Sequence, residues 1–223
     1  KYTVFSHCLF LVLMINSGII KASSDSIPPR HKITLREAHI GDLEVDTRLL
    51  DSYLQLSEST REFYLNARSV FEVTPDADFT NIKITEAARK SNVILMGGPM
   101  LGNLNENGVT IWLRPSSADP LIIRVTKLDG SKERPYLVKP GKPGIEQRIK
   151  VDGLTSDTEY KYAIYSQKYK IAEGGFKTTP TSDNKSIFNL TFGSCFHKIG
   201  LHNPNLINQI LSREPQAMML LGD

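Results

Sequence analysis

The sequence predicts a mixed fold in three parts: an N-terminal helical segment, a β-sandwich and the first βαβ unit of an α/β domain. Apolar residues recur at helical spacing up to about Val93, and from there they alternate with polar residues. Near the end of the sequence, two short apolar runs flank a stretch long enough for one helix. We therefore divide the chain into four regions, which are residues 1–24, 25–95, 96–180 and 187–223.

The composition is that of an ordinary globular protein with room for one or two domains. Among 223 residues, 27 Lys and Arg oppose 24 Asp and Glu, which gives a formal net charge of +3. This excess is too small to indicate a nucleic acid partner. The oligomeric state cannot be inferred from the sequence.

Residues 1–24 have the pattern of a secretory signal peptide. Lys1 is followed by an apolar run from Cys8 to Ile15, and Ala22 begins a group of small residues that suits cleavage. The run is too short for a transmembrane helix, so we expect an exported protein, periplasmic or extracellular, without a transmembrane anchor. Because processing removes Cys8, Cys195 is the one thiol expected in the mature chain.

Region 25–95 shows interrupted helical signals. Ser59 and Glu62 have the spacing of a capping box, and a short helix is expected from Thr85 to Lys90. The predicted apolar faces contain Leu50, Tyr53 and Leu54 in one helix and Phe63, Ala67 and Val70 in the next. The polar residues of this region form no ligand or nucleophile pattern.

Region 96–180 shows the period-two pattern of an all-β sandwich. Apolar residues alternate with polar ones, and turn residues punctuate the runs. The inward positions are expected to include Val109, Ile111, Leu113, Ile123, Val125, Tyr160, Tyr162 and Ile164. Separating turns are expected at 97–99, 129–130, 139–141 and 173–175.

A tyrosine corner is predicted at the start of one of these strands. Leu154 precedes a polar turn, and Tyr160 follows six residues after the leucine. In a tyrosine corner the phenol bonds to the backbone a few residues upstream. Region 96–180 resembles a fibronectin type III domain in this motif and in the predicted last strand, which runs into Thr179-Pro180. This fold hosts many functions, so the resemblance does not indicate an activity.

Basic residues are frequent on the turn-rich parts of the predicted sandwich. They form either a positive rim that attracts an anionic substrate or acidic envelope polymer, or lysines that protect the edge strands from pairing. The residues concerned are Lys127, Lys132, Arg134, Lys139, Lys142, Arg148 and Lys150.

The apolar pattern of region 187–223 predicts a strand, a helix and a second strand. The runs 188–192 and 217–221 read as buried parallel strands, and between them Asn203 and Pro204 can start a helix that Pro215 stops. Its apolar face would consist of Leu206, Ile207, Ile210 and Leu211. Parallel strands end at the same edge of a sheet, which is where such sheets bind ligands.

Cys195 follows the first predicted strand and Asp223 follows the second. A thiolate prefers a transition metal and a carboxylate can bridge to a harder ion, so both residues are candidate metal ligands. A small buried core residue is the alternative role for the cysteine. His197 and His202 lie between them and are candidates for binding phosphate or supporting a ligand, or else ordinary surface residues.

Phe192-Gly193-Ser194-Cys195, followed by a strand that ends in Gly222-Asp223, resembles the PhoD-like alkaline phosphatases and phosphodiesterases of the calcineurin-like metallophosphoesterase superfamily. The resemblance implies a signal peptide, a fibronectin-like domain and then a four-layer catalytic domain, of which only the start is present. It implies iron and calcium as cofactors, with Cys195 on iron and Asp223 as a metal ligand. It also implies a phosphate ester substrate hydrolysed by metal-activated water, with the remaining ligands beyond Asp223, so that this part alone is inactive.

Two other families of phosphatase and one class of binding protein are the alternatives. Purple acid phosphatases also place a fibronectin-like domain first, but they begin their ligand set with Asp-x-Gly where this sequence has Gly193-Ser194-Cys195. Cysteine-dependent phosphatases require arginine where this sequence has Leu201. The alternative from another class is a non-catalytic, envelope-associated binding protein with a fibronectin-like domain.

Overall fold

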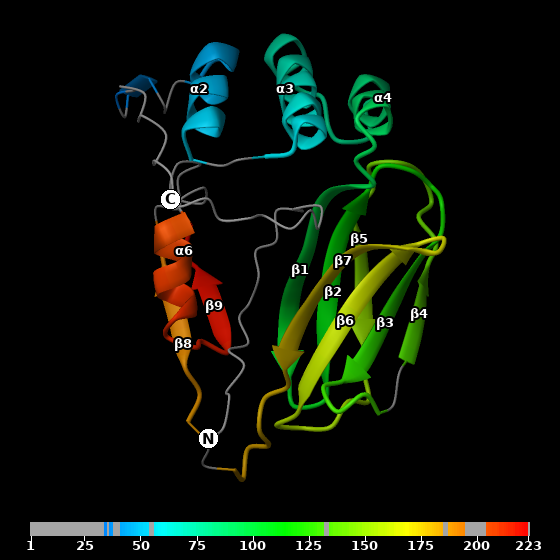
Figure 1. Ribbon diagram of the computed structural model, residues 1–223, viewed down its shortest axis with the longest axis vertical. Coiled ribbons are helices and arrows are strands. Elements are labelled where there is room, and N and C mark those ends of the chain that lie inside the picture. The colour runs from blue at the N-terminus through cyan, green and yellow to red at the C-terminus, as the bar shows by residue number, and fades with distance from the viewer. Residues whose placement is uncertain are drawn as a thin grey trace.

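The computed structural model describes residues 34, 36–37, 41–53, 56–131, 134–184, 187–194 and 204–222. It has a mixed α/β fold with three helices before a pair of antiparallel sheets and a strand–helix–strand unit after them (Figure 1). The expected signal peptide at 1–24 lies outside these residues. Within the described part of the chain, no helix is long and apolar enough to cross a membrane.

The N-terminal segment consists of α2 (Leu43–Tyr53), α3 (Glu58–Val73) and α4 (Ile82–Lys90). As the spacing predicts, α3 buries its face of Phe63, Ala67 and Val70. This face packs with Ile84, Ala87 and Ala88 of α4 into a small core. In the first two helices, buried Asp46 accepts a hydrogen bond of 2.6 Å from Arg68, which ties α2 to α3.

The predicted capping box of α3 was misplaced. The N-cap is Ser57, whose hydroxyl accepts a hydrogen bond of 3.3 Å from the Thr60 N–H, whereas Ser59 lies inside the helix. Both serines precede the same apolar face, so sequence spacing does not distinguish them. Helix α4 also begins at Ile82, earlier than the expected Thr85. Asn81 caps it, because the Asn81 side chain accepts a hydrogen bond from the Lys83 N–H.

Seven antiparallel strands form two sheets, with strand order β1-β2-β5 in one and β4-β3-β6-β7 in the other. Figure 1 shows the two sheets stacked as the layers of a sandwich, in green to yellow. The strands are β1 (Leu95–Asn105), β2 (Gly108–Pro115), β3 (Leu121–Lys127), β4 (Arg134–Val138), β5 (Gln147–Val151), β6 (Glu159–Ser166) and β7 (Tyr169–Lys177).

The inward positions of both sheets form one apolar core, as the alternation predicts. Val109, Ile111 and Leu113 of β2 face Ile123 and Val125 of β3. Tyr160, Tyr162 and Ile164 of β6 complete the same core, together with Leu95, Leu121, Val138, Val151, Leu154 and Phe176. Burial of this apolar surface is the main stabilising contribution to the sandwich.

Two of the four predicted turns are wrong, because their glycines lie inside strands. Gly97-Gly98-Pro99 belongs to β1, where the register against β2 shifts and the Gly98–Pro99 peptide is cis. Residues 173–175 belong to β7, where Gly174 lies opposite Tyr162 of β6. The turns at 129–130 and 139–141 connect strands as expected.

The tyrosine corner is present. The Thr155 N–H donates to the Tyr160 hydroxyl oxygen at 2.8 Å, and Leu154 is buried beneath it. Thr178 reinforces the same corner, because its hydroxyl donates to the Thr155 carbonyl at 2.6 Å and accepts from the Thr158 N–H at 3.0 Å. The corner therefore connects the loop before β6 to the end of β7.

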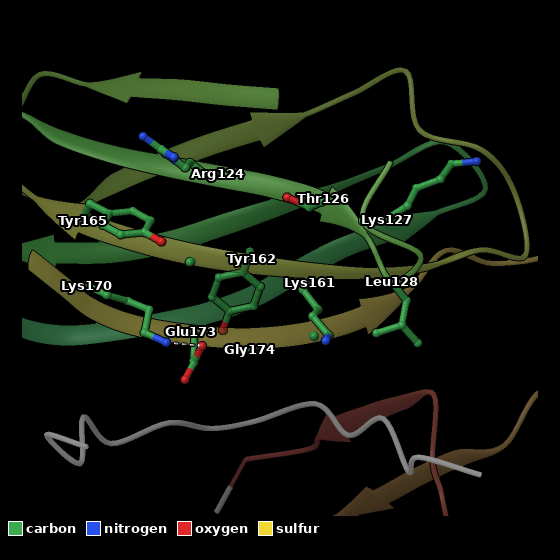
Figure 2. A pocket seen from close by; sticks show the side chains of 13 residues that line it. Arg124, Thr126, Lys127, Leu128, Lys161, Tyr162, Tyr165, Lys170, Glu173 and Gly174 are labelled. Atoms are coloured by element: carbon green, nitrogen blue, oxygen red, sulfur yellow. Dashed lines mark hydrogen bonds and ion pairs between the residues drawn. The ribbon is translucent and has the colours of Figure 1, made fainter. Parts of the chain in front are cut away.

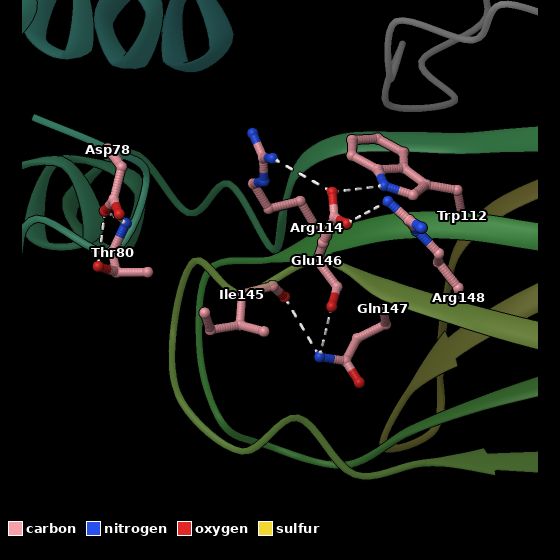
Figure 3. A network of polar contacts seen from close by, with 8 residues as sticks. All are labelled: Asp78, Thr80, Trp112, Arg114, Ile145, Glu146, Gln147 and Arg148. Atoms are coloured by element: carbon pink, nitrogen blue, oxygen red, sulfur yellow. Dashed lines mark hydrogen bonds and ion pairs between the residues drawn. The ribbon is translucent and has the colours of Figure 1, made fainter.

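The helical segment is joined to the sandwich through Arg114 of β2. Its guanidinium lies 4.2 Å from the ring centroid of Phe79 in the α3–α4 connection and 5.4 Å from that of Trp112. Glu146 holds this joint from the β4–β5 connection: it accepts from Trp112 Nε1 at 3.0 Å and from Arg148 at 2.6 Å, and it lies 3.7 Å from Arg114 (Figure 3).

Candidate functional site

The strand–helix–strand unit contains β8 (Leu190–Gly193), α6 (Pro204–Leu211) and β9 (Ala217–Leu220). The two strands pair in parallel, with Leu190 opposite Ala217 and Gly193 opposite Leu220. The pairing continues past the strands, since the Leu221 N–H donates to the Gly193 carbonyl at 2.9 Å. The predicted βαβ arrangement and its parallel pairing are therefore present.

The carboxyl ends of β8 and β9 lie at one edge of this small sheet. Ser194 directly follows β8, while Leu221 and Gly222 follow β9. Cys195 and Asp223 come next in the sequence, and both lie outside the described residues. His197 and His202 lie outside them as well, so the ligand assignments stay predictions.

The described residues contain no group of three or more His, Cys, Asp or Glu that could hold a metal ion. A metal site at this edge would therefore depend on Cys195, on Asp223 and on ligands elsewhere. As a donor set, one thiolate and one carboxylate suit a transition metal beside a harder cation.

The apolar runs of this unit are more exposed than the sequence predicts. Phe192 of β8 is 69% exposed and Met219 of β9, directly opposite, is 50% exposed. Both were expected in buried strands, and that expectation is wrong for the structure described. Two short strands and one helix offer too few layers to cover both faces of a sheet.

A second candidate site lies on the outer face of the four-stranded sheet, and of the basic residues expected to form a positive rim it includes Lys127 alone. It is a hollow of about 530 Å³ bordered by β3, β6 and β7. Four cations border it, Arg124, Lys127, Lys161 and Lys170, together with one carboxylate, Glu173 (Figure 2). We call this hollow the basic groove. In the sequence, its residues are among the outward-facing positions of the alternating strands. Which of these positions lie next to one another is known only from the strand register.

The register explains why the surface is hollow there. Ala163 of β6 has Arg124 of β3 on one side and Glu173 of β7 on the other, and Lys161 has Thr126 and Gly175 beside it. Ala163 is thus the small residue at the centre of the first row across the sheet, and Gly175 is the small residue at the β7 end of the second row. The side chains around these two residues are longer. Glycine and alanine form the floor, and charged side chains form the walls.

The groove's side chains are held in place by neighbours. The Arg124 guanidinium lies 5.1 Å from the Tyr165 ring centroid, and Lys170 Nζ is 2.7 Å from Glu173 Oε2. A hydrogen bond from Lys170 to Glu173 raises the pKa of the lysine, which stays protonated at neutral pH. Beneath the groove, burial raises the pKa of Tyr162 to about 12, so its phenol is uncharged.

Comparison with known proteins assigns no family. No family model matches the chain, and no curated protein matches it. Among solved structures, PhoD is similar at a TM-score of 0.39 and 13% identity, over 55% of this chain and 37% of the PhoD chain. The sensor domain of the anti-sigma factor RsgI4 from Pseudobacteroides cellulosolvens has a TM-score of 0.31 and 8% identity, over 36% of this chain and 89% of that domain.

A redesigned β-sandwich protein is similar at a TM-score of 0.31 and 13% identity, over 37% of this chain and 90% of its own. At such scores and identities, none of these likenesses assigns an activity to the chain. This chain spans little more than a third of the PhoD structure's length.

Proposed function

We propose that this chain is the N-terminal part of an exported, metal-dependent phosphomonoesterase or phosphodiesterase of the PhoD-like type. In this proposal the sandwich is a fibronectin type III-like domain and the βαβ unit begins the catalytic α/β domain. The proposal is supported chiefly by the parallel pairing of β8 and β9, with Gly193 opposite Leu220. Because of this pairing, β8 and β9 end at the same edge of the sheet, and Cys195 and Asp223 follow these strand ends closely in the sequence.

In the proposed site, Cys195 as thiolate would hold iron and Asp223 would be a carboxylate ligand, with calcium as a further ion. Such cations polarise phosphoryl oxygens and lower the pKa of bound water. Cys195 has the role of ligand and not of nucleophile. His197 and His202 are candidates for hydrogen bonds to the phosphate ester or to a ligand.

The exposure of the βαβ unit agrees with its membership of a larger domain. Phe192 and Met219 lie opposite each other and form an apolar strip on one face of the sheet. In a layered α/β domain such a strip is covered by further strands and helices. The proposed catalytic domain supplies layers of this kind.

The test uses a protein that contains this chain together with the proposed remainder of the catalytic domain. Iron content is measured together with hydrolysis of p-nitrophenyl phosphate and bis-p-nitrophenyl phosphate. We expect Cys195→Ala to remove the iron and most of the activity, and Asp223→Asn to reduce both. Ser194→Ala is the matched control, because Ser194 is adjacent and exposed but is assigned no ligand role.

If Cys195→Ala retains the metal and the rate, the ligand assignment is wrong. If the unaltered protein hydrolyses neither ester in the presence of iron and calcium, the enzymatic proposal is wrong as a whole. The second candidate function, a non-catalytic envelope-associated binding protein, is then favoured by the basic groove on the sandwich.

A further inference from the structure

We propose that the basic groove binds a linear acidic polysaccharide that carries carboxylate groups. This inference rests on the sandwich alone and does not depend on the proposed phosphatase activity. It requires a hollow of sufficient size, cations spaced along it and hydrogen-bonding groups between them. Each of these is found on the outer face of β3, β6 and β7.

The groove is large enough for a segment of a polymer. Its volume of about 530 Å³ lies in the range of small-molecule binding sites, and it opens widely to solvent on the sheet surface. An open groove admits a chain that continues beyond it at both ends. A closed pocket would have indicated a small, separate ligand.

Three of the cations, each on a different strand, lie at successive positions along the strand direction. The strand register places Lys161, Arg124 and Lys170 on three successive outward lines across the sheet, since Lys161 pairs with Thr126, Arg124 with Ala163 and Lys170 with Tyr165. Outward lines are two residues apart, which corresponds to about 7 Å along a strand. A ligand with anionic groups repeated along its length can therefore contact Lys161 and Arg124 in succession, whereas Lys170 is already paired with Glu173.

Hydrogen-bonding groups lie between the cations. Lys170 contacts one carboxylate oxygen of Glu173, Oε2, and in the described contacts the other oxygen remains available as an acceptor. Thr126 adds a hydroxyl next to Lys161. Sugar hydroxyls can donate to such acceptors. A polyphosphate offers only acceptors and has no group that could donate to Glu173.

Of the two tyrosines that line the groove, Tyr162 and Tyr165, the outward-facing Tyr165 favours a sugar polymer over a nucleic acid. Single-stranded nucleic acids bind by stacking their bases on exposed aromatic rings. Here Arg124 lies against Tyr165, with 5.1 Å between its guanidinium carbon and the ring centroid. The ring thus positions the arginine, whose planar group can bind a carboxylate through two parallel hydrogen bonds.

Binding is tested on the 223-residue chain with fluorescently labelled polygalacturonate oligomers, by anisotropy at low ionic strength. The double variant Arg124→Gln/Lys161→Gln removes two charges that border the groove. We expect it to weaken binding about three- to tenfold, which is the effect of losing two exposed ionic contacts. The matched control is Arg148→Gln/Lys150→Gln, which removes the same charges from β5, where the two side chains are 70% and 76% exposed.

The expected result is that the groove variant loses affinity and melts at a temperature close to that of the unaltered chain, while the β5 control retains its affinity. A carboxyl-reduced, neutral form of the polymer should not bind. Three results would overturn the proposal: no binding of polygalacturonate, an equal loss in the β5 control, or equally tight and equally sensitive binding of polyphosphate or oligothymidylate. The last result would assign the groove to phosphate polymers.

Discussion

Gly174 of β7 lies directly opposite Tyr162 of β6, and the tyrosine ring fills the space that a side chain at position 174 would occupy. A Cβ atom there would lie 2.5 Å from the phenol oxygen and 2.7 Å from the ring atoms Cε1 and Cζ. Real Cβ atoms do not approach other atoms so closely. The glycine is therefore fixed by a neighbour on another strand, and β7 accepts a residue that ordinarily weakens strands.

Gly174→Ala should destabilise the sandwich by about 1–3 kcal/mol, because the tyrosine ring must move within a packed core. Urea unfolding measures the change. Gly102→Ala in β1 is the matched control, because an added Cβ there meets nothing within 4 Å, and it should have little effect. Equal losses in the two variants would contradict this account of β7.

Removing the hydroxyl from Tyr160 should destabilise the sandwich, whereas removing it from Tyr162 should not. The Tyr160 oxygen accepts from the Thr155 N–H at 2.8 Å, so Tyr160→Phe should cost about 1 kcal/mol. The Tyr162 hydroxyl is buried, with the residue 2% exposed, and makes no hydrogen bond within the described part of the chain. Tyr162→Phe should therefore be neutral or stabilise by up to about 1 kcal/mol. Thermal unfolding of the two variants provides the comparison, and a matching loss in both would contradict it.

Acid should weaken the joint between the helical segment and the sandwich. The hydrogen bond from Trp112, with Arg148 and Arg114 nearby, lowers the pKa of Glu146 from its ordinary value of 4.5. A lowered pKa in the folded state means that the carboxylate contributes stability above pH 4.5 and loses that contribution as the pH falls through the folded value. The unaltered chain should therefore be more stable than Glu146→Gln at pH 7, with the difference shrinking below pH 4.5.

Chemical unfolding across this pH range measures the effect on the joint. Glu62→Gln is the control at pH 7, because Glu62 is exposed on α3 away from the joint, and it should change stability little. A difference between the chain and Glu146→Gln that stays constant down to low pH would show that the Glu146 charge does not stabilise the joint.

The apolar strip on the βαβ unit should bind a hydrophobic dye. Phe192 and Met219 are exposed and lie opposite each other on one face of the sheet. Phe192→Ser/Met219→Ser should reduce the fluorescence of bound anilinonaphthalene sulfonate in the isolated chain and leave the melting temperature of the sandwich unchanged. Ile164→Ser is the opposite case: this core residue is fully buried in β6, and the change should destabilise the sandwich by several kcal/mol. Unchanged dye fluorescence would show that the strip is covered.

The parts of the fold that were predicted correctly depend on local patterns. Alternation in β2 and β6 identified the inward residues, because one face of each strand meets the opposite sheet. The tyrosine corner was recognised because both groups, at Thr155 and Tyr160, are close in sequence. Parallel pairing of β8 with β9 followed from a helix-length connection between two apolar runs.

The parts that were missed depend on neighbours distant in sequence. The sequence predicts a turn at Gly174, because its contact with Tyr162 is not visible before the strands are paired. The groove cations Arg124, Lys127, Lys161 and Lys170 come from three strands and share no local motif. Phe192 was expected to be buried because it is apolar, although burial also requires a covering layer. Cys195 and Asp223 lie outside the described residues, so the predicted metal ligands stay predictions.

The connections of the sandwich differ in how they would tolerate engineering. The β4–β5 connection approaches the helical segment so closely that a Cβ atom on Gly144, which has a φ of +79°, would overlap the carbonyl of Phe79. At the β3–β4 turn, by contrast, nothing lies within 4 Å of the position a Cβ on Gly130 would take. The fold should therefore tolerate a fluorophore or an epitope tag better beside Gly130 than beside Gly144, although Gly130 also borders the basic groove. The same insertion beside Gly144 would separate the helices from the strands that support them.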